Sequence, residues 1–495
     1  MSDRSKSASK RFSFGADRVF IPALIVLTVC AYQPAWRGTP IMDDDQHLIA
    51  AQAKSIDGLM RLWTAPNTTQ QYHPVVDTVF WIGKNVWDDS MLGYHMVNIF
   101  LHAGCALLLW RILRRLAIPG ASLASALFAL HPVHVESVAW IVELKNTLSG
   151  VFFLGALLAY LKFDQERKWT SYVLVTVLFC LGLLAKPIVA LLPIAILIVH
   201  WWKSGRIQWK RDVRPLFLFM VVGIAAGLAA AWMERWRIST GDWWQYLFPI
   251  AALILFAAAW SLRKRSRWPL AALAFFVVML LPVIGLFNVH FFNLSFVADH
   301  FDYLPSLGII APVAAGGALF LEQLHGTRRR VVTFLFVGLI LALITLTWRQ
   351  SWMFRDAETC YRMIIEKNPD AWAAESNLGL TLLEKGEVND AIAHFQNVLE
   401  ISPNNSDGAR AAHLNLGNAL LRKRSIDAAI SHFEAALKIA PDAETHNSFG
   451  SALRRKGQFN QAIAHYEAAL EISPQSTSML NNLAWLLATC PDALY

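Results

Sequence analysis

Long apolar stretches separated by short basic segments constrain this chain more than any other feature. Eleven stretches approach or exceed the ~18 residues that an α-helix needs to cross a bilayer. They lie near residues 19–36, 91–113, 118–138, 146–163, 169–185, 187–202, 213–233, 246–262, 268–287, 302–321 and 330–348. With 55% hydrophobic and only 16% charged residues, the composition excludes an ordinary soluble protein. We therefore predict an all-α protein whose residues 1–348 form a polytopic membrane helix bundle of about 11 spans.

The positions of lysine and arginine predict how these spans are oriented. Basic residues gather at the N-terminus, after the second, fourth, sixth and eighth spans, and before the last one. Counting the spans in order places all of these segments on one side, and short basic segments remain in the cytoplasm. The N-terminus is then cytoplasmic, whereas the loop 37–90, the loop 288–301 and the tail from about 350 lie outside. Topology thus accounts for the net charge of +8, which gives little reason to expect nucleic-acid binding.

The chain lacks the common short motifs of cofactor and metal sites. Its five cysteines form no CxxC pair, and no P-loop, dinucleotide fingerprint or GxSxG elbow occurs. We therefore predict no disulfide framework, no bound cofactor and no metal site, although a requirement for a divalent metal stays open.

A repeat begins where the apolar stretches stop. The segment Asn377-Leu378-Gly379 recurs as Asn415-Leu416-Gly417, and prolines 369, 403, 441 and 474 follow one another at intervals of 34, 38 and 33 residues. This pattern resembles tetratricopeptide repeats, in which paired helices stack into a solenoid. Residues 349–495 are therefore predicted to form about three repeats and a partial fourth. Binding of an extended partner segment is the expected role, and a rigid spacer is the alternative.

Three consecutive aspartates, Asp43 to Asp45, follow the first span. A helix lying on the membrane is predicted from Asp44 to Trp63, and an aspartate at its start is typical of an N-cap. One aspartate is enough for a cap. Because carboxylates at a membrane surface are costly, we favour a functional role for at least one of the three.

A second polar group surrounds the predicted junction between the third and fourth spans. His131, His134 and Glu136 are followed by Glu143 and Lys145. Pro132 interrupts a regular helix and the spacing is not HExxH, so a polar cavity that holds a phosphate or a sugar is favoured over a metal site. A re-entrant loop whose polar groups satisfy one another is the alternative.

Further polar residues are expected on the same outer side. His73 lies in Tyr72-His73-Pro74, and Asp299 and His300 lie in an aromatic loop that precedes the tenth span. Aromatic residues there are commonly interface anchors. Lys186 lies in a very short outer turn, where it either faces the outer cavity or snorkels.

Taken together, these segments resemble the membrane O-mannosyltransferases that end in tetratricopeptide repeats, and their bacterial homologues. The resemblance rests on MDDDQHLI, YHPVVDTVFW, the passage from His95, ALFALHPVHVESVAWIVELKNTLS and VADHFDYLPSLG. It implies the C-type glycosyltransferase fold, with a catalytic acid in the first outer loop and a polyprenyl-phosphate sugar as donor. Bacterial members often have ERKD where this chain has Glu143 to Asn146, and ADRY where it has Ala298 to Phe301.

Carried onto this sequence, the resemblance makes Asp44, or next Asp45, the catalytic base. The residues implied to line the sugar and phosphate pocket are His73, His131, His134, Glu136, Lys145, Asp299 and His300. The implied function is transfer of a hexose such as mannose to protein Ser or Thr hydroxyls outside the cytoplasm, with the repeats recruiting the acceptor and a bacterial inner membrane as the location. The alternatives are a non-catalytic membrane scaffold whose repeats bind envelope proteins, and a lipid-linked transporter.

Overall fold

The computed structural model of the chain describes residues 14–41, 44, 48, 54–64, 72–233, 247–283, 299–402 and 406–489. Within these ranges the only regular secondary structure is helical, which confirms the all-α prediction. The chain divides into two compact units, Met1–Arg355 and Asp356–Tyr495. The predicted residues Asp43 and Asp45 lie outside the described residues.

Each predicted apolar span contains an α-helix in the first unit. The helices are α2 (Phe14–Ala31), α6 (Met91–Arg115), α7 (Ala121–Leu130), α9 (Leu144–Glu166), α10 (Trp169–Ala185), α11 (Leu192–Ser204), α12 (Phe217–Met233), α13 (Leu247–Leu262), α14 (Trp268–Leu280), α15 (Leu307–Gln323) and α16 (Gly326–Ser351). Among the described residues, 5 helical stretches are long and apolar enough to cross a membrane: Met91–Arg115, Ile141–Glu166, Pro187–Ser204, Trp209–Ala229 and Gly326–Arg355. This is an apolar helix bundle of the kind that membranes require.

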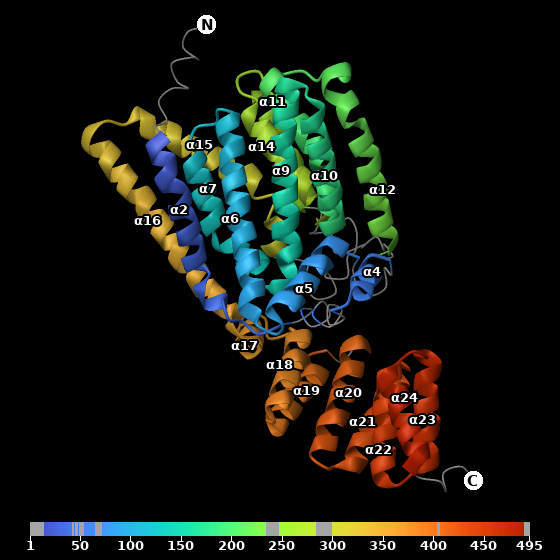
Figure 1. Cartoon of the computed structure of the whole chain (residues 1–495). Helices are drawn as coiled ribbons and strands as arrows, with labels where there is room; N and C mark the ends of the chain where they lie inside the picture. The colour runs from blue at the N-terminus through green and yellow to red at the C-terminus, as the bar shows by residue number, and fades with distance from the viewer. Residues whose placement is uncertain are drawn as a thin grey trace. The chain divides into compact units, whose positions relative to one another are not determined.

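Helices α6, α9 and α10 run side by side in this bundle, and α7 packs against α6 (Figure 1). The inner face of α9 is lined by fully buried residues such as Phe153, Ala156 and Tyr160. By contrast, many side chains of α16 are exposed, including Phe334 and Leu335. In water such a surface would be unfavourable, so these side chains are expected to face lipid.

The helix expected over residues 118–138 is shorter in the structure, because α7 ends at Leu130. His131 takes an extended conformation, as is usual before a proline, and Pro132 cannot donate a backbone hydrogen bond. Three short helices follow: η2 (Pro132–His134), α8 (Val135–Ala139) and η3 (Ile141–Glu143). This irregular segment gathers polar side chains just before α9 begins.

Two helices from the first predicted outer loop are described, α4 (Ile56–Thr64) and α5 (Pro74–Trp87). Leu62 of α4 is buried, whereas Ile56 and Met60 are exposed, which agrees with an amphipathic helix at a surface. Helix α5 places Val76 and Phe80 in a core with Leu144 at the start of α9. The loop therefore packs onto the irregular segment instead of standing away from it.

The second unit begins with the short helix α17 (Ala357–Lys367) and continues as helix pairs that confirm the predicted repeats. The pairs are α18 (Trp372–Lys385) with α19 (Val388–Ile401), α20 (Ser406–Arg422) with α21 (Ile426–Ile439) and α22 (Ala443–Lys456) with α23 (Phe459–Ile472), and α24 (Thr477–Thr489) follows. Each pair crosses at a glycine. A Cβ atom on Gly417 would lie 2.4 Å from the ring of Phe433, so only glycine allows this approach.

Candidate functional site

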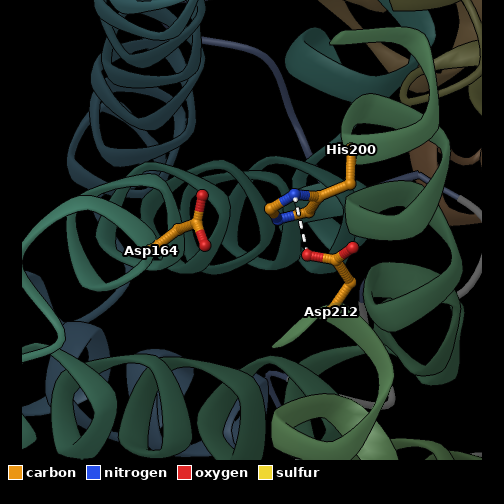
Figure 2. A group of neighbouring side chains, drawn as sticks. All are labelled: Asp164, His200 and Asp212. Carbon is orange, nitrogen blue, oxygen red and sulfur yellow. Dashed lines mark ion pairs between the residues drawn. The ribbon is translucent and has the colours of Figure 1, made fainter. Parts of the chain in front are cut away.

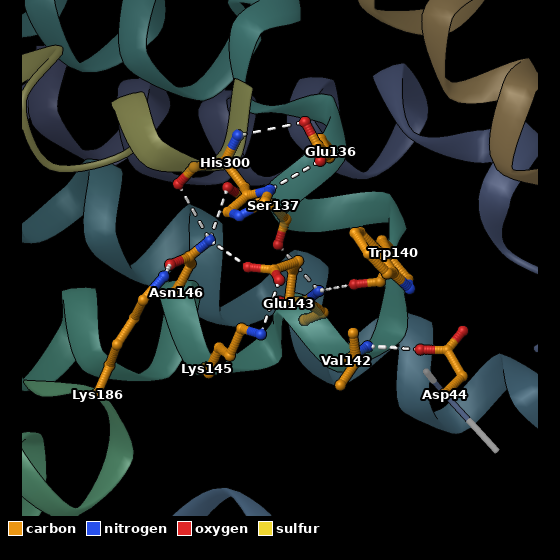
Figure 3. Close-up of polar contacts among 11 residues, drawn as sticks. Asp44, Glu136, Ser137, Trp140, Val142, Glu143, Lys145, Asn146, Lys186 and His300 are labelled. Carbon is orange, nitrogen blue, oxygen red and sulfur yellow. Dashed lines mark hydrogen bonds and ion pairs between the residues drawn. The ribbon is translucent and has the colours of Figure 1, made fainter. Parts of the chain in front are cut away.

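Asn146 stands at the centre of a buried polar network at the start of α9 (Figure 3). Its Nδ2 lies 2.6 Å from Glu143 Oε2, 3.1 Å from Ser137 Oγ and 3.2 Å from the carbonyl oxygen of His300. Its Oδ1 accepts a hydrogen bond from the Lys186 ammonium group. An amide nitrogen has two hydrogens, so three acceptors must share them. One side chain thus joins α8, α9, the turn after α10 and the segment at 299–302.

Two lysines surround the one buried carboxylate of this network. Glu143 is 1% exposed, and its Oε1 lies 2.9 Å from Lys145 Nζ. Lys186 reaches the same group through Asn146. Two ammonium groups therefore lie close to this carboxylate. In a site shielded from water, cations of this kind attract an anion.

Glu136 and His300 form a second ion pair next to the network. Glu136 Oε1 lies 2.7 Å from His300 Nδ1, and Oε2 accepts a bond of 3.3 Å from the backbone N–H of His300. Because a carboxylate accepts hydrogen bonds, Nδ1 of His300 carries a proton. This pair fixes the short helix η10 (Asp299–Asp302) against α8. Two of the predicted site residues are thus brought together.

Asp44 is wholly buried and contacts the irregular segment before α9. Its Oδ1 accepts a hydrogen bond of 2.8 Å from the backbone N–H of Val142, and its Oδ2 accepts one of 2.9 Å from Ile41. Backbone N–H donors of this kind stabilise an ionised carboxylate. The contact with Val142 brings Asp44 to the residue next to Glu143, as Figure 3 shows. The burial of this aspartate inside the protein was not predicted from the sequence.

His131 and His134 belong to a neighbouring group that is mainly aromatic. The ring of His134 lies 4.5 Å from that of Phe128 and 5.2 Å from that of Tyr303, measured between centroids. Burial lowers the pKa of His134 well below its usual value, so this histidine is neutral. Burial also lowers the pKa of His131, although the charge of Asp299 opposes this effect. Within the described residues, these histidines do not converge with a third metal-ligating group.

The remaining predicted residues lie at the margins of these groups. His73 is buried at the N-cap position of α5, just before Pro74. Asp299 Oδ2 accepts a hydrogen bond of 3.4 Å from Gln350 near the end of α16. The structure therefore brings Asp44, Glu136, Lys145 and His300 around one segment, while His131 and His134 pack beside it.

Sequence reasoning missed the central position of Asn146 and the contact made by Ser137. Both residues lie in the same polar stretch as the predicted histidines, at the start of a long apolar helix. An amide side chain at the start of an apolar helix could have indicated such a network, because polar groups inside a membrane protein must find partners. Lys186 was singled out for its place in a short turn, but its link to Asn146 required the structure.

Comparison with known families gives matches to both units. A family described as dolichyl-phosphate-mannose-protein mannosyltransferase matches residues 71–233. Tetratricopeptide-repeat families match residues 370–442 and 450–488. The first match includes the whole of α5 to α12 and hence Asn146 and its lysine neighbours.

Similar curated proteins are named protein O-mannosyl-transferases. A Caenorhabditis elegans protein O-mannosyl-transferase is 25% identical over 440 residues, which is 77% of this chain and 62% of that protein. A human protein O-mannosyl-transferase is 24% identical over 408 residues, covering 61% of this chain and 54% of its own length. This chain thus spans less than two thirds of these relatives.

Among solved structures, a mycobacterial arabinofuranosyltransferase, AftD, resembles this chain at 17% identity and a TM-score of 0.43. The alignment covers 70% of this chain and 27% of that chain. Similarity at this level is too weak to establish a common fold.

Proposed function

We propose that this chain transfers a hexose to protein hydroxyl groups, because it belongs to the family of membrane protein O-mannosyltransferases that carry tetratricopeptide repeats. The donor is a polyprenyl-phosphate sugar, with mannose as the first candidate. Residues 1–348 form the transferase domain, with about 11 spans and the C-type glycosyltransferase fold. Residues 349–495 bind the acceptor protein. The site opens on the non-cytoplasmic side, as the distribution of basic residues predicts.

One observation carries this proposal more than any other. The Asp44 carboxylate accepts a hydrogen bond from Val142, directly beside a network that contains the ammonium groups of Lys145 and Lys186. A phosphate-linked sugar transferase needs these two parts together. It needs a carboxylate that can take a proton and cations that can stabilise a phosphate leaving group.

The chemistry then follows from the two parts. The acceptor hydroxyl oxygen attacks C1 of the sugar and forms the new glycosidic bond, while the bond between C1 and the phosphate oxygen breaks. The hydroxyl proton passes to Asp44, or to Asp45 as the second candidate. The polyprenyl phosphate leaves with the bonding electron pair, and Lys145 and Lys186 stabilise its charge.

The other candidate residues have supporting roles in this proposal. Glu136 and His300 hold the segment at 299–302 in place beside the donor. His73, His131 and Asp299 line the sugar side of the site. His134, neutral and packed among aromatic rings, positions the turn that carries His131.

Replacing Asp44 tests the base. In membranes that contain the full chain, Asp44→Asn is expected to lower the transfer of radiolabelled mannose from polyprenyl-phosphate mannose to protein by on the order of 10²–10⁴-fold. The matched control is Asp89→Asn, which changes an aspartate side chain that is 83% exposed. If Asp44→Asn is folded and transfers mannose at the rate of the control, the assignment of the base is wrong.

Replacing the lysine tests the phosphate contact separately. Lys186→Ala is expected to raise the KM for the donor by roughly tenfold or more, because a hydrogen bond to a charged group contributes about 1.5–3 kcal/mol. Lys54→Ala is the control, since that lysine pairs with Asp88 at the surface. An unchanged donor KM would contradict the role of Lys186.

A non-catalytic membrane scaffold is the second candidate, and the burial of Asp44 favours it. Asp44 is 0% exposed and both of its oxygens accept backbone hydrogen bonds, which suits a structural link between two segments. In that case Asp44→Asn lowers the thermal stability of the protein, and neither the variant nor the unaltered chain transfers sugar. If the unaltered chain transfers sugar and the Asp44→Asn variant is folded but inactive, the transferase is the correct interpretation.

A further inference from the structure

A second cluster of ligand-type side chains lies at the opposite end of α9 from Asn146. It consists of Asp164 near the end of α9, His200 near the end of α11 and Asp212 in η5 (Trp209–Val213). Eighteen helical residues separate Asn146 from Asp164, which corresponds to roughly 27 Å at 1.5 Å per residue. The cluster is therefore a different place from the candidate transferase site.

The three side chains face one another closely enough to bind one ion. One possible ligand atom from each of the three side chains lies within 4.8 Å of the other two, and the described part of the chain contains no other such group. Figure 2 shows the imidazole of His200 between the two carboxylates. His200 Nδ1 lies 3.6 Å from Asp212 Oδ1, which is longer than a normal hydrogen bond. Asp212 is fixed in place, because its Oδ2 accepts a 2.8 Å bond from the backbone N–H of Gln208.

Two buried polar atoms at this cluster have no hydrogen-bond partner among the residues that the structure describes. One is Nε2 of His200, a residue that is only 9% exposed, and the other is the hydroxyl of Tyr160, which is 0% exposed. Their rings meet edge to face at 5.9 Å between centroids. Tyr160 lies one helical turn before Asp164, on the same side of α9. Buried polar atoms without partners are rare in native proteins, and a bound ion or water is a common explanation.

Two arginines accompany the two carboxylates of the cluster, and a cation would have to displace one of them. Arg167 pairs with Asp164 near the surface. Arg211 lies 3.5 Å from Asp164 and 3.8 Å from Asp212, and its side chain is 57% exposed. An exposed pair at such distances contributes little to stability. Displacing the Arg211 side chain would therefore cost the protein little stability. A divalent ion in its place would contact both carboxylates.

We propose that Asp164, His200 and Asp212 bind one divalent transition-metal ion. Two carboxylate oxygens and one imidazole nitrogen suit Zn²⁺ or Mn²⁺, and the three ligands come from three different elements. The ion joins the ends of α9 and α11 to η5 on the side that carries the basic segments. It acts on the stability of this end of the bundle and takes no part in sugar transfer.

Direct measurement of bound zinc tests the site. The full chain in detergent is freed of metal with a chelator and dialysed against micromolar Zn²⁺, and the bound zinc is measured by atomic absorption. About one equivalent is expected, and Asp212→Asn and His200→Gln are expected to lower the zinc affinity on the order of tenfold or more each. Asp427→Asn, a change at a side chain that is 84% exposed, serves as the control.

Arg211→Ala separates a metal site from a cluster of ion pairs. If the cluster binds metal, removing the competing guanidinium tightens zinc binding, and zinc raises the unfolding temperature of the variant more than that of the parent. If the cluster is only a set of ion pairs, zinc changes the unfolding temperature of neither the parent nor Arg211→Ala. The proposal is also overturned if the folded parent binds no more zinc than Asp212→Asn.

Discussion

The polar groups of the two units are held in place in opposite ways. In the membrane unit, Asn146 contacts the carbonyl oxygen of His300, 154 positions away in the chain. In the repeat unit, a polar pair joins the two helices of each repeat and always spans 19 positions: Glu375 with His394, His413 with His432, and His446 with His465. The first arrangement depends on many segments at once, whereas the second is built within one repeat. Damage should therefore spread through the membrane unit and remain local in the repeats.

The largest effect is expected at the centre of the membrane network. Asn146→Leu removes one partner of Lys186 and one partner of Glu143, which weakens the hydrogen bonding of two charged groups. Breaking a buried charged network in this way typically costs about 3–5 kcal/mol. Thermal unfolding of the full chain measures the loss, and hydrogen exchange should show faster exchange at both α8 and α9.

Asn146→Ser is the milder companion of that change, because a hydroxyl keeps one donor and one acceptor. It should lie between Asn146→Leu and the parent in stability. Equal stability of all three proteins would show that the network does not hold these segments together.

A smaller and more local effect is expected where the repeat helices cross. Gly417→Ala places a Cβ atom 2.4 Å from Phe433, and such overpacking typically costs about 1–3 kcal/mol. Hydrogen exchange should increase in α20 and α21, with little change in α9. The double change Gly417→Ala with Phe433→Leu makes space and should recover part of the loss. Exchange that spreads evenly into the membrane unit would contradict the local character of the repeats.

The smallest effect is expected from pH on the histidine pairs. Burial lowers the pKa of His413, His432, His446 and His465 below the usual value of about 6.5, and a second histidine nearby lowers those of His413 and His465 further. The unfolded chain therefore binds more protons, so stability present above pH 6.5 is lost as the pH falls below it. A drop of a few degrees in the unfolding temperature of the repeat unit is expected between about pH 7 and pH 5.

The first repeat supplies the control for this pH dependence. Its equivalent pair is Glu375 with His394, 2.6 Å apart, in which the histidine faces a carboxylate in place of a second histidine. His413→Glu recreates that pair in the second repeat and should reduce the loss of stability at acid pH. A repeat unit whose pH dependence is the same with and without this change would show that the histidine pairs do not titrate as described.

The repeats were predictable in detail because the packing contacts within each helix pair are close in sequence. Gly417 and Phe433 are 16 positions apart, and the same spacing recurs in the neighbouring repeats. The apolar helices were predictable for a related reason, since a membrane demands about 18 apolar residues in a row. The exact ends of these helices were less predictable. Helix α7, for example, ends at Leu130, before His131 and Pro132.

The site was predictable only as a set of residue types. The sequence singled out Asp44, Glu136, Lys145 and His300, but not which side chains each of them would contact. Nothing in local pattern says that Asp44 accepts a hydrogen bond from Val142, 98 positions later, or that Asn146 lies between Glu143 and Lys186. The cluster of Asp164, His200 and Asp212 was missed for the same reason, because its members come from three separate elements.

By itself, the sequence determined an apolar helical unit and a repeat unit, because hydrophobic length and repeat spacing are local properties of the chain. The tertiary structure alone decided which polar side chains meet. It buried Asp44 against Val142, joined two lysines through Asn146, and brought two aspartates and a histidine together at the far end of α9. The physical reason is that a buried polar group must find a partner wherever the packing of the helices places one.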